Sequence, residues 1–250
     1  MTAVFVIAVA LVGAAAGVGA VSSLDAGDRR PSTSTASPAT NRIPVFEDNF
    51  DGTKLNTSKW TPYHSPGNGD NGLRRPSAFS LDGKGTLVVT ARMVGGRIVS
   101  GGMASRRTVT YGRFEVRVRT EPDPAGTMSG VVLTWPQSGN WPTDGENNIY
   151  ETGAGVNSRS PFHSFVHYGA NNKQYVITQR ADGAQWHTMV MDWRPSAITF
   201  YRDGAFVGQV TNRAAIPDVP HFLAIQLDAT RTRPLTRPVR MYVDYVRIYP

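Results

Sequence analysis

The stretch Arg113–Arg119, R-F-E-V-R-V-R, decides the fold class. Its apolar residues Phe114, Val116 and Val118 alternate with charged ones. Side chains of a β-strand point alternately to the two faces of a sheet, so a period of two predicts a strand with one buried face. We therefore expect these three residues to point inward and the charged residues to face water.

Strand signals recur on both sides of this stretch. They are residues 86–92 before a G-G pair at 95–96, residues 129–135, the two halves of 197–208 around D-G at 203–204, and 241–249. The D-G pair predicts a hairpin turn, and the continuously apolar run 129–135 predicts a central strand. With 25 glycines and 17 prolines to make turns and no long helical period after the N-terminus, the chain is expected to be all-β. We predict a β-sandwich of two antiparallel sheets.

Length, charge and composition exclude several classes of function. The 250 residues suffice for one large domain, and the net charge is +7. The absence of cysteine excludes disulfides, cysteine metal sites and a thiol nucleophile. The sequence also has no G-x-S-x-G elbow, no H-E-x-x-H zinc motif, and no phosphate-binding or dinucleotide-binding glycine loop.

The N-terminal region divides into an apolar segment and a polar one. Residues 3–21 are almost entirely apolar, with a small-residue cleavage site after Ala20. Two interpretations remain open: a cleaved export signal (residues 1–21) or an uncleaved membrane anchor, because the run is just long enough to span a bilayer. Both predict a secreted or envelope-associated protein. Residues 22–44 are small, polar and proline-rich, which predicts a disordered linker before a domain at 45–250.

A basic cluster occupies Arg231–Arg240, R-T-R-P-L-T-R-P-V-R. It carries four arginines and no acidic residue, and its prolines predict a loop. Binding to nucleic acid lacks a supporting motif, so we expect no nucleic-acid partner. The cluster then either adheres to an acidic envelope polymer or forms a simple solvated loop.

The segment Trp141–Glu151, W-P-T-D-G-E-N-N-I-Y-E, places Glu146 and Glu151 five positions apart in a predicted strand. A retaining glycosidase needs two carboxyl groups about 5–5.5 Å apart, one as nucleophile and one as acid/base. Residues five apart on a regular strand point to opposite faces, but a one-residue bulge between them would restore a common face. The alternative is a strand end with two solvated glutamates.

This segment resembles the active-site strand of glycoside hydrolase family 16, whose pattern is W-P-x-x-G-E-[IL]-D-[IF]-x-E. The matching residues are Trp141, Pro142, Gly145, Glu146, Ile149 and Glu151. The resemblance extends over residues 45–250 and includes the segments 46–60, 100–118, 186–204 and 241–249. It implies a jelly roll of two curved sheets with a concave substrate cleft, and retaining endo-hydrolysis of β-linked glucan or a related polysaccharide. Glu146 is then the nucleophile and Glu151 the acid/base.

Two asparagines depart from the family pattern. Asn148 stands where the family has an aspartate, on the same face as Glu146. An asparagine can orient Glu146 by a hydrogen bond, but without a charge it does not raise the pKa of the acid/base. Asn147 stands where the family favours an apolar residue. It should lie on the core face and would need a hydrogen-bond partner there.

A sugar site needs aromatic faces and polar side chains around the carboxyl groups. The resemblance and the neighbourhood of the glutamates suggest five substrate-binding residues: Trp135, Trp141, His167, Gln226 and Arg106. The face of Tyr150 depends on the bulge. We expect the remaining tryptophans, Trp60, Trp186 and Trp193, in the core.

The resemblance also raises a structural calcium site on the convex side, with Asp244 as one ligand. A single carboxylate is a weak calcium signal, since the ion takes six to eight oxygens. We expect no other cofactor and a monomer. A glycan-binding protein with weakened catalysis and a transglycosylase remain open beside the hydrolase, and the sequence leaves the sugar and the linkage open.

Overall fold

A computed structural model gives the structure of the protein, and it describes residues 22–23, 42–155 and 158–250. Within these ranges the backbone forms β-strands joined by turns and three short 3-10 helices, η1 (Asn68–Asp70), η2 (Pro76–Ala78) and η3 (Arg213–Ala215). The all-β class predicted from the alternating pattern is confirmed.

The described residues form eighteen strands. They are β1 (Ser22–Ser23), β2 (Phe46–Asp48), β3 (Trp60–Pro62), β4 (Ser65–Pro66), β5 (Leu73–Arg74), β6 (Phe79–Leu81), β7 (Leu87–Val94), β8 (Arg97–Val109), β9 (Gly112–Thr120), β10 (Met128–Pro136), β11 (Glu146–Glu151), β12 (Phe162–Tyr168), β13 (Lys173–Gln179), β14 (His187–Arg194), β15 (Ala197–Arg202), β16 (Ala205–Val210), β17 (His221–Ala229) and β18 (Val239–Tyr249).

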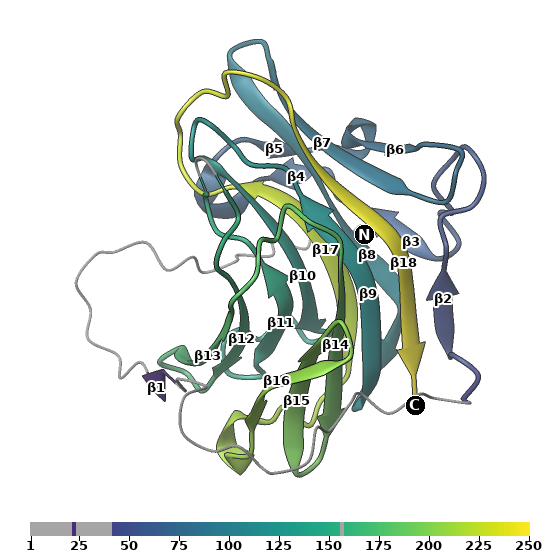
Figure 1. Cartoon of the computed structure of the whole chain (residues 1–250), viewed down its shortest axis with the longest axis vertical. Coiled ribbons are helices and arrows are strands. Elements are labelled where there is room, and N and C mark those ends of the chain that lie inside the picture. The colour runs from purple at the N-terminus through teal and green to yellow at the C-terminus, as the bar shows by residue number, and fades with distance from the viewer. Residues whose placement is uncertain (1–21, 24–41, 156–157) are drawn as a thin grey trace.

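The strands build two layers. Sheet A runs in the order β13, β12, β11, β10, β17, β8, β3, all antiparallel, and β1 pairs in parallel with the β13 edge. Sheet B runs in the order β16, β15, β14, β9, β18, after which β7 and β2 share the other edge of β18. Both sheets curve, and β8, β17, β10, β11, β12 and β13 form the concave one (Figure 1).

The long hairpin β7–β8 connects the two layers. β7 pairs with β18 of sheet B through residues 87–91, and its outer end pairs with β8, whose inner part belongs to sheet A. Its turn is the predicted G-G pair, and both Gly95 and Gly96 have a positive φ. The sandwich is therefore joined by backbone hydrogen bonds as well as by its core.

The main core lies between the sheets, and a second apolar cluster lies on the opposite face of sheet A. The inward residues of β9 are buried in the main core, as the alternation predicts. The second cluster consists of Tyr63, Val131, Leu133, Trp135, Phe222 and Ala224. Because it lies on the face of sheet A turned away from the core, it marks the concave face of the molecule.

The strands predicted from sequence recur with small shifts at their ends. Residues 129–135 lie within the central strand β10, all of whose residues are buried. The D-G pair 203–204 joins β15 to β16. The tryptophans follow the prediction in two of three cases: Trp60 and Trp193 are buried in the core, whereas Trp186 is not. Trp186 lies half-buried against the guanidinium groups of Arg117 and Arg119, 4.7 and 5.3 Å from its ring centroid.

The N-terminal predictions fall largely outside the described residues. The export signal or anchor at 1–21 lies there, as do residues 24–41 of the predicted linker. Within that linker Ser22 and Ser23 form the short strand β1 beside Tyr175 and Val176, where the composition predicts no regular structure. No helix in the described ranges has the length and apolar character needed to cross a membrane.

Asp123 anchors the loop that leads into β10. Its carboxylate accepts hydrogen bonds from the backbone N–H groups of Ala125, Thr127 and Met128, at 2.9, 2.6 and 2.7 Å. Because Asp123 is buried, its removal leaves these donors without partners, and the free energy of unfolding should fall by roughly 2–4 kcal/mol in Asp123→Ala. Urea denaturation measures this.

The matched control is Asp82→Ala. Asp82 also accepts from two backbone N–H groups, those of Lys84 and Thr86, but at an exposed turn where water can replace it. Its loss should be distinctly smaller. Equal losses in the two variants would contradict the role of burial.

Candidate active site

A β-bulge in β11 brings the two glutamates to one face. In the ladder with β10, Leu133 pairs with Asn148 and Val132 pairs with Tyr150, so Ile149 has no partner of its own. The ladder with β12 shifts at the same place. The extra residue cancels the odd spacing, and the bulge predicted between residues 148 and 151 is confirmed.

The face of each β11 side chain follows from the bulge. Glu146 pairs with His167, and Glu151 pairs with Val131 of the concave cluster. Ile149 and Tyr150 belong to the main core, where the Tyr150 hydroxyl donates to the Gly183 carbonyl at 2.7 Å. Tyr150 therefore does not face the site.

Asn148 lies between the glutamates and bonds to the second of them. Its Nδ2 donates to Glu151 Oε2 at 2.6 Å, and its Oδ1 is buried without a hydrogen-bond partner among the described residues. The family pattern predicts that Asn148 orients Glu146. It lies near enough to lower the pKa of Glu146, but the well-formed hydrogen bond goes to Glu151.

Burial raises the pKa of both carboxyl groups, because it penalises their charged forms. The pKa of Glu146 rises to about 8, opposed by the nearby Trp141 and Asn148 side chains. The pKa of Glu151 rises to about 7 by burial and by the charge of Glu146, opposed by Asn148 and His167. Since each carboxylate resists ionisation of the other, the two groups titrate as a pair that holds one proton near neutral pH.

Two tryptophans and a histidine flank Glu146. The rings of Trp135 and Trp141 stack with centroids 5.9 Å apart and planes at 10°. The His167 ring lies 6.4 Å from that of Trp141. His167 Nδ1 is paired with Asn172 Oδ1 at 2.9 Å, and its buried Nε2 has no partner among the described residues. The structure thus brings these three predicted residues to Glu146.

Of the other two predicted residues, one lies on the concave face and one does not. Gln226 pairs across the ladder with Val131, the neighbour of Glu151. Arg106 is exposed, and its Nε donates to the Thr57 carbonyl at 2.8 Å, away from the glutamates. A register shift in β8, between the partners of residues 222 and 224, breaks the alternation that would point Arg106 inward.

Asn147 is buried on the core side, as its position predicts, and its amide nitrogen has a hydrogen-bond partner there, whereas its Oδ1 has none among the described residues. Its Nδ2 donates to Thr134 Oγ1 at 3.0 Å, which also contacts His221 Nδ1 at 3.1 Å. His221 Nε2 lies 3.0 Å from the carbonyl oxygen of Asp144, so this ring nitrogen carries the hydrogen. Burial lowers the pKa of His221 to about 4, which keeps the ring neutral. His221 thus holds the backbone just before Glu146.

Arg159 holds the other end of β11. Its Nη1 donates to the carbonyl oxygens of Gly153 and Met128, at 2.6 and 2.7 Å, and its Nε to that of Glu121 at 2.9 Å. The side chain is fully buried. Sequence reasoning missed both Arg159 and His221, because their partners are backbone atoms of distant segments and no motif marks them.

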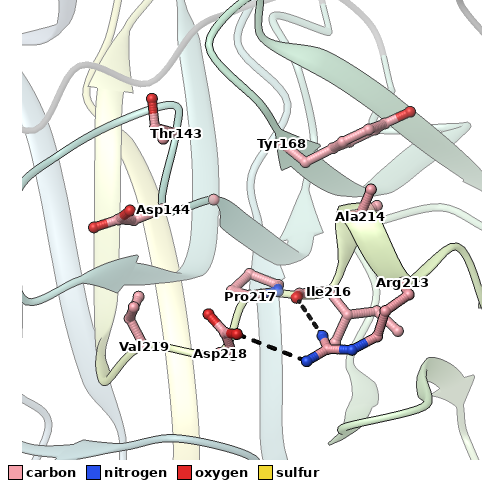
Figure 2. Close-up of a pocket in the computed structure, with 11 residues that line it drawn as sticks. Thr143, Asp144, Tyr168, Arg213, Ala214, Ile216, Pro217, Asp218 and Val219 are labelled. Atoms are coloured by element: carbon pink, nitrogen blue, oxygen red, sulfur yellow. Dashed lines mark hydrogen bonds and ion pairs between the residues drawn. The ribbon is translucent and has the colours of Figure 1, made fainter.

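A pocket of about 350 Å³ lies beside the turn that precedes Glu146. It is lined by residues 143–145, Tyr168 and 213–219, and none of the site residues lines it. Figure 2 shows its arginine, Arg213, bound to the Asp218 carboxylate (3.7 Å) and the Ile216 carbonyl (3.1 Å). A side chain at Gly145 would meet Pro217 at 2.6 Å, so this wall fixes the turn. The residues of this wall therefore pack against the turn before β11, and the pocket itself is separate from the glutamates.

Asp244 has an arginine as its partner. Its carboxylate forms an ion pair with Arg117 on the outer face of sheet B, at 2.5 Å. In the ranges that the structure describes, no three histidine, aspartate or glutamate side chains gather to hold a metal ion. The calcium site at Asp244 therefore stays a prediction.

Comparisons with known proteins agree with this geometry. The sequence profile described as Glycosyl hydrolases family 16 matches residues 50–247. A β-glucanase of Bacillus subtilis is 30% identical over 124 residues, which is 49% of each chain. A β-glucanase of Acetivibrio thermocellus is 27% identical over 218 residues, 83% of this chain and 62% of the relative. The chain thus spans 49% and 62% of the length of these two curated relatives.

Solved structures share the fold. A variant of LamA from Zobellia galactanivorans, in complex with laminaritriose and laminaritetraose, superposes with a TM-score of 0.70 at 23% identity, covering 85% of this chain and 100% of the other. The profile match, which covers most of the chain, shows that the protein belongs to family 16 of the glycosyl hydrolases.

The raised pKa values predict how the glutamates affect stability. Their ordinary value is 4.5, so the folded chain binds more protons than the unfolded chain above that pH, and stability falls as the pH rises through this window. Glu146→Gln and Glu151→Gln should each raise the free energy of unfolding by roughly 1–3 kcal/mol near pH 9 and by almost nothing near pH 4. Urea titrations at both pH values measure this, and an equal gain at both would contradict it.

Proposed function

We propose that this protein is an exported, retaining endo-glycosidase that hydrolyses a β-linked glucan or a related polysaccharide. The observation that carries the proposal is the bulge at Ile149, which puts Glu146 and Glu151 on one face with Asn148 between them. The apolar segment at residues 3–21 supports export.

The first half-reaction forms a glycosyl-enzyme. Protonated Glu151 gives its proton to the glycosidic oxygen while the Glu146 carboxylate attacks the anomeric carbon. The bond to the leaving sugar breaks, and an ester between Glu146 and the retained sugar forms. In the second half, the Glu151 carboxylate takes a proton from water, whose oxygen attacks the anomeric carbon and releases Glu146. Two inversions give net retention.

This reaction needs one proton on the pair of glutamates, and that proton must be on Glu151. In the ligand-free site the two pKa values, about 8 for Glu146 and about 7 for Glu151, stand in the reverse order. The values belong to the coupled pair, and bound substrate decides where the proton resides, since the glycosidic oxygen faces one carboxyl and the anomeric carbon the other. Asn148 serves both states of Glu151, because its amide nitrogen donates to the anion and its oxygen accepts from the acid.

The relatives suggest the substrate class. Two are named β-glucanases, and a variant of LamA is solved in complex with laminaritriose and laminaritetraose. Stacked Trp135 and Trp141 supply the aromatic surface on which pyranose rings pack. A β-1,3-glucan is therefore the first substrate to test. Transfer to a second sugar in place of water would use the same residues.

A glycan-binding protein with lost catalysis is the second candidate function. The observation that favours it is Asn148, an uncharged side chain at the family's aspartate position. Hydrolysis by the native chain separates the two, since a binder would show affinity without product.

The roles of the glutamates are tested by substitution. Glu146→Gln and Glu151→Gln should each lower kcat on laminarin by at least about 10³-fold, because one loses the nucleophile and the other the proton donor. Azide should partly restore Glu146→Ala and give a glycosyl azide of inverted configuration, identified by NMR. Glu115→Gln, on the outer face of sheet B, is the matched control and should retain full activity. Turnover like that of the wild type in either active-site variant would refute the assignment.

The pH dependence tests the pairing of the carboxyls. Because one proton must be present, kcat/KM should rise through about pH 7 and fall above about pH 8. Asn148→Asp removes the amide donor and adds a like charge, both of which raise the pKa of Glu151, so the optimum should move to higher pH. Asn148→Ala removes only the donor and should shift it less. If the native chain only binds, Asn148→Asp should instead create hydrolysis where there was none.

A further inference from the structure

A cluster of polar side chains lies on the core side of sheet A, next to the turn that precedes Glu146. Asn147 Nδ2 donates to Thr134 Oγ1 at 3.0 Å, and Thr134 Oγ1 lies 3.1 Å from His221 Nδ1. His221 Nε2 lies 3.0 Å from the carbonyl oxygen of Asp144. All three side chains are fully buried. We call Asn147, Thr134 and His221 the buried polar cluster.

Each hydrogen bond of the buried polar cluster has a fixed direction. The Asp144 carbonyl can only accept, so His221 Nε2 carries a hydrogen. Burial lowers the pKa of His221 and keeps the ring neutral, so its Nδ1 has no hydrogen and accepts from the Thr134 hydroxyl. The Thr134 oxygen in turn accepts from the Asn147 amide. One arrangement of the three side chains therefore places a donor opposite an acceptor at every step from Asn147 to Asp144.

The two ends of this series lie on either side of Glu146 in the sequence. Asn147 follows the glutamate directly, and Asp144 precedes it by two residues. Glu146 is the first residue of β11, and in the ladder with β10 the first paired residue is Asn147. Backbone pairing with β10 therefore stops just short of Glu146. The buried polar cluster supplies an attachment on the preceding side, where this ladder has ended.

The turn before Glu146 is held from a second direction. The ring of Trp193 packs on that of His221, with centroids 5.0 Å apart, and its Nε1 donates to the Pro217 carbonyl at 3.1 Å. Pro217 in turn packs against Gly145, where an added Cβ atom would lie 2.6 Å from its Cγ. The residues just before Glu146 are thus confined between the His221 ring and Pro217.

The buried polar cluster is an expensive way to fill this part of the core. An apolar residue at position 147, as the family pattern favours, would not require an amide to leave water. The Oδ1 atom of Asn147 is buried and has no hydrogen-bond partner among the described residues, which adds to the cost. Packing alone therefore favours apolar side chains. What the polar side chains add is a fixed direction for the Asp144 carbonyl and for the backbone around it.

We propose that Asn147, Thr134 and His221 are positioning residues for Glu146. By holding the backbone on both sides of the glutamate, they keep its carboxylate aimed at the anomeric carbon. The proposal rests on the proposed function, in which Glu146 is the nucleophile, and it concerns the step that forms the glycosyl-enzyme. The three residues lie on the opposite face of the sheet from the glutamates and do not touch the substrate.

The test compares variants of the full chain on laminarin. Thr134→Val keeps the shape of the side chain and breaks the series at its centre. It should lower kcat about ten- to a hundredfold, because small displacements of a reacting group are costly, and it should change KM less than about twofold. Thr134→Ser keeps the hydroxyl and should restore most of kcat. Asn147→Leu removes one hydrogen bond at the end of the series and should lower kcat about three- to tenfold.

Thr199→Val is the matched control. The Thr199 hydroxyl also accepts from a side-chain amide, that of Gln209, at 2.8 Å, but it lies in sheet B between β15 and β16. Its loss should leave both kcat and KM at the values of the wild type. A general effect of removing a strand hydroxyl would instead appear in both threonine variants.

An activated substrate shows which glutamate is displaced. A 2,4-dinitrophenyl β-laminaribioside releases a phenolate that needs no proton, so its first turnover depends on the nucleophile and not on the proton donor. The defect of Thr134→Val should persist in this first turnover. The defect of Glu151→Gln should largely disappear.

Three results overturn the positioning role and leave the proposed function intact. They are a kcat of Thr134→Val and Asn147→Leu equal to that of the wild type, equal impairment of Thr134→Val and Thr134→Ser, and relief of the Thr134→Val defect by the activated substrate. If Thr134→Val does not fold, Asn147→Leu decides by the same measurements, since leucine suits the core.

If the wild type releases no product from any substrate, the proposed function fails. Covalent labelling of Glu146 by an epoxyalkyl laminaribioside, followed by mass spectrometry, then decides the positioning role. Slower labelling of Thr134→Val than of the wild type and of Thr199→Val supports it. Equal labelling of the three proteins, or none, overturns it.

Discussion

The site depends on one backbone irregularity, the unpaired residue Ile149 in β11. A regular strand would turn Glu151 into the core, where a carboxyl group facing apolar side chains would be strongly destabilising. With the bulge, Ile149 and Tyr150 both enter the core and Glu151 returns to the face of Glu146. The interactions at the two ends of the strand, from His221 to Asp144 and from Arg159 to Gly153, hold this short segment in place. The common face of the two glutamates and the packing of the core are therefore set by the same residue.

The regular parts of the fold could be predicted from sequence because they depend on local patterns. The alternation in residues 113–119 and the D-G turn at 203–204 are each patterns of a few neighbouring residues, and the strand, its inward apolar residues and the turn are confirmed. Of the charged residues predicted to face water, Arg113 is buried instead. The bulge could also be inferred, since two glutamates at odd spacing share one face of a strand only if an extra residue lies between them. The prediction for Trp186 is wrong because its surroundings are two arginines of another strand, which no pattern around residue 186 reveals.

Side-chain partners were harder to predict than side-chain positions. Four of the five predicted binding residues lie on the concave face, as expected: Trp135, Trp141, His167 and Gln226. Arg106 turns away from it at a register shift in β8, which the residues around Arg106 do not reveal. The hydrogen bond from Asn148 goes to Glu151, where the family pattern led us to expect Glu146 as its partner. Arg74 comes from a segment 152 and 154 residues before its partners Gln226 and Asp228 on β17, so only the folded chain brings them together.

The hairpin β7–β8 ties the two sheets together by main-chain bonds, and this has a mechanical consequence. In a sandwich held by side-chain packing alone, one layer can slide over the other at the cost of rearranging contacts. Here such sliding would have to break the ladder of β7 with β18 or that of β8 with β17. The curvature of the concave layer is thus coupled to the opposite layer, and a long polymer pulled across the groove would meet a stiff surface and not a hinge.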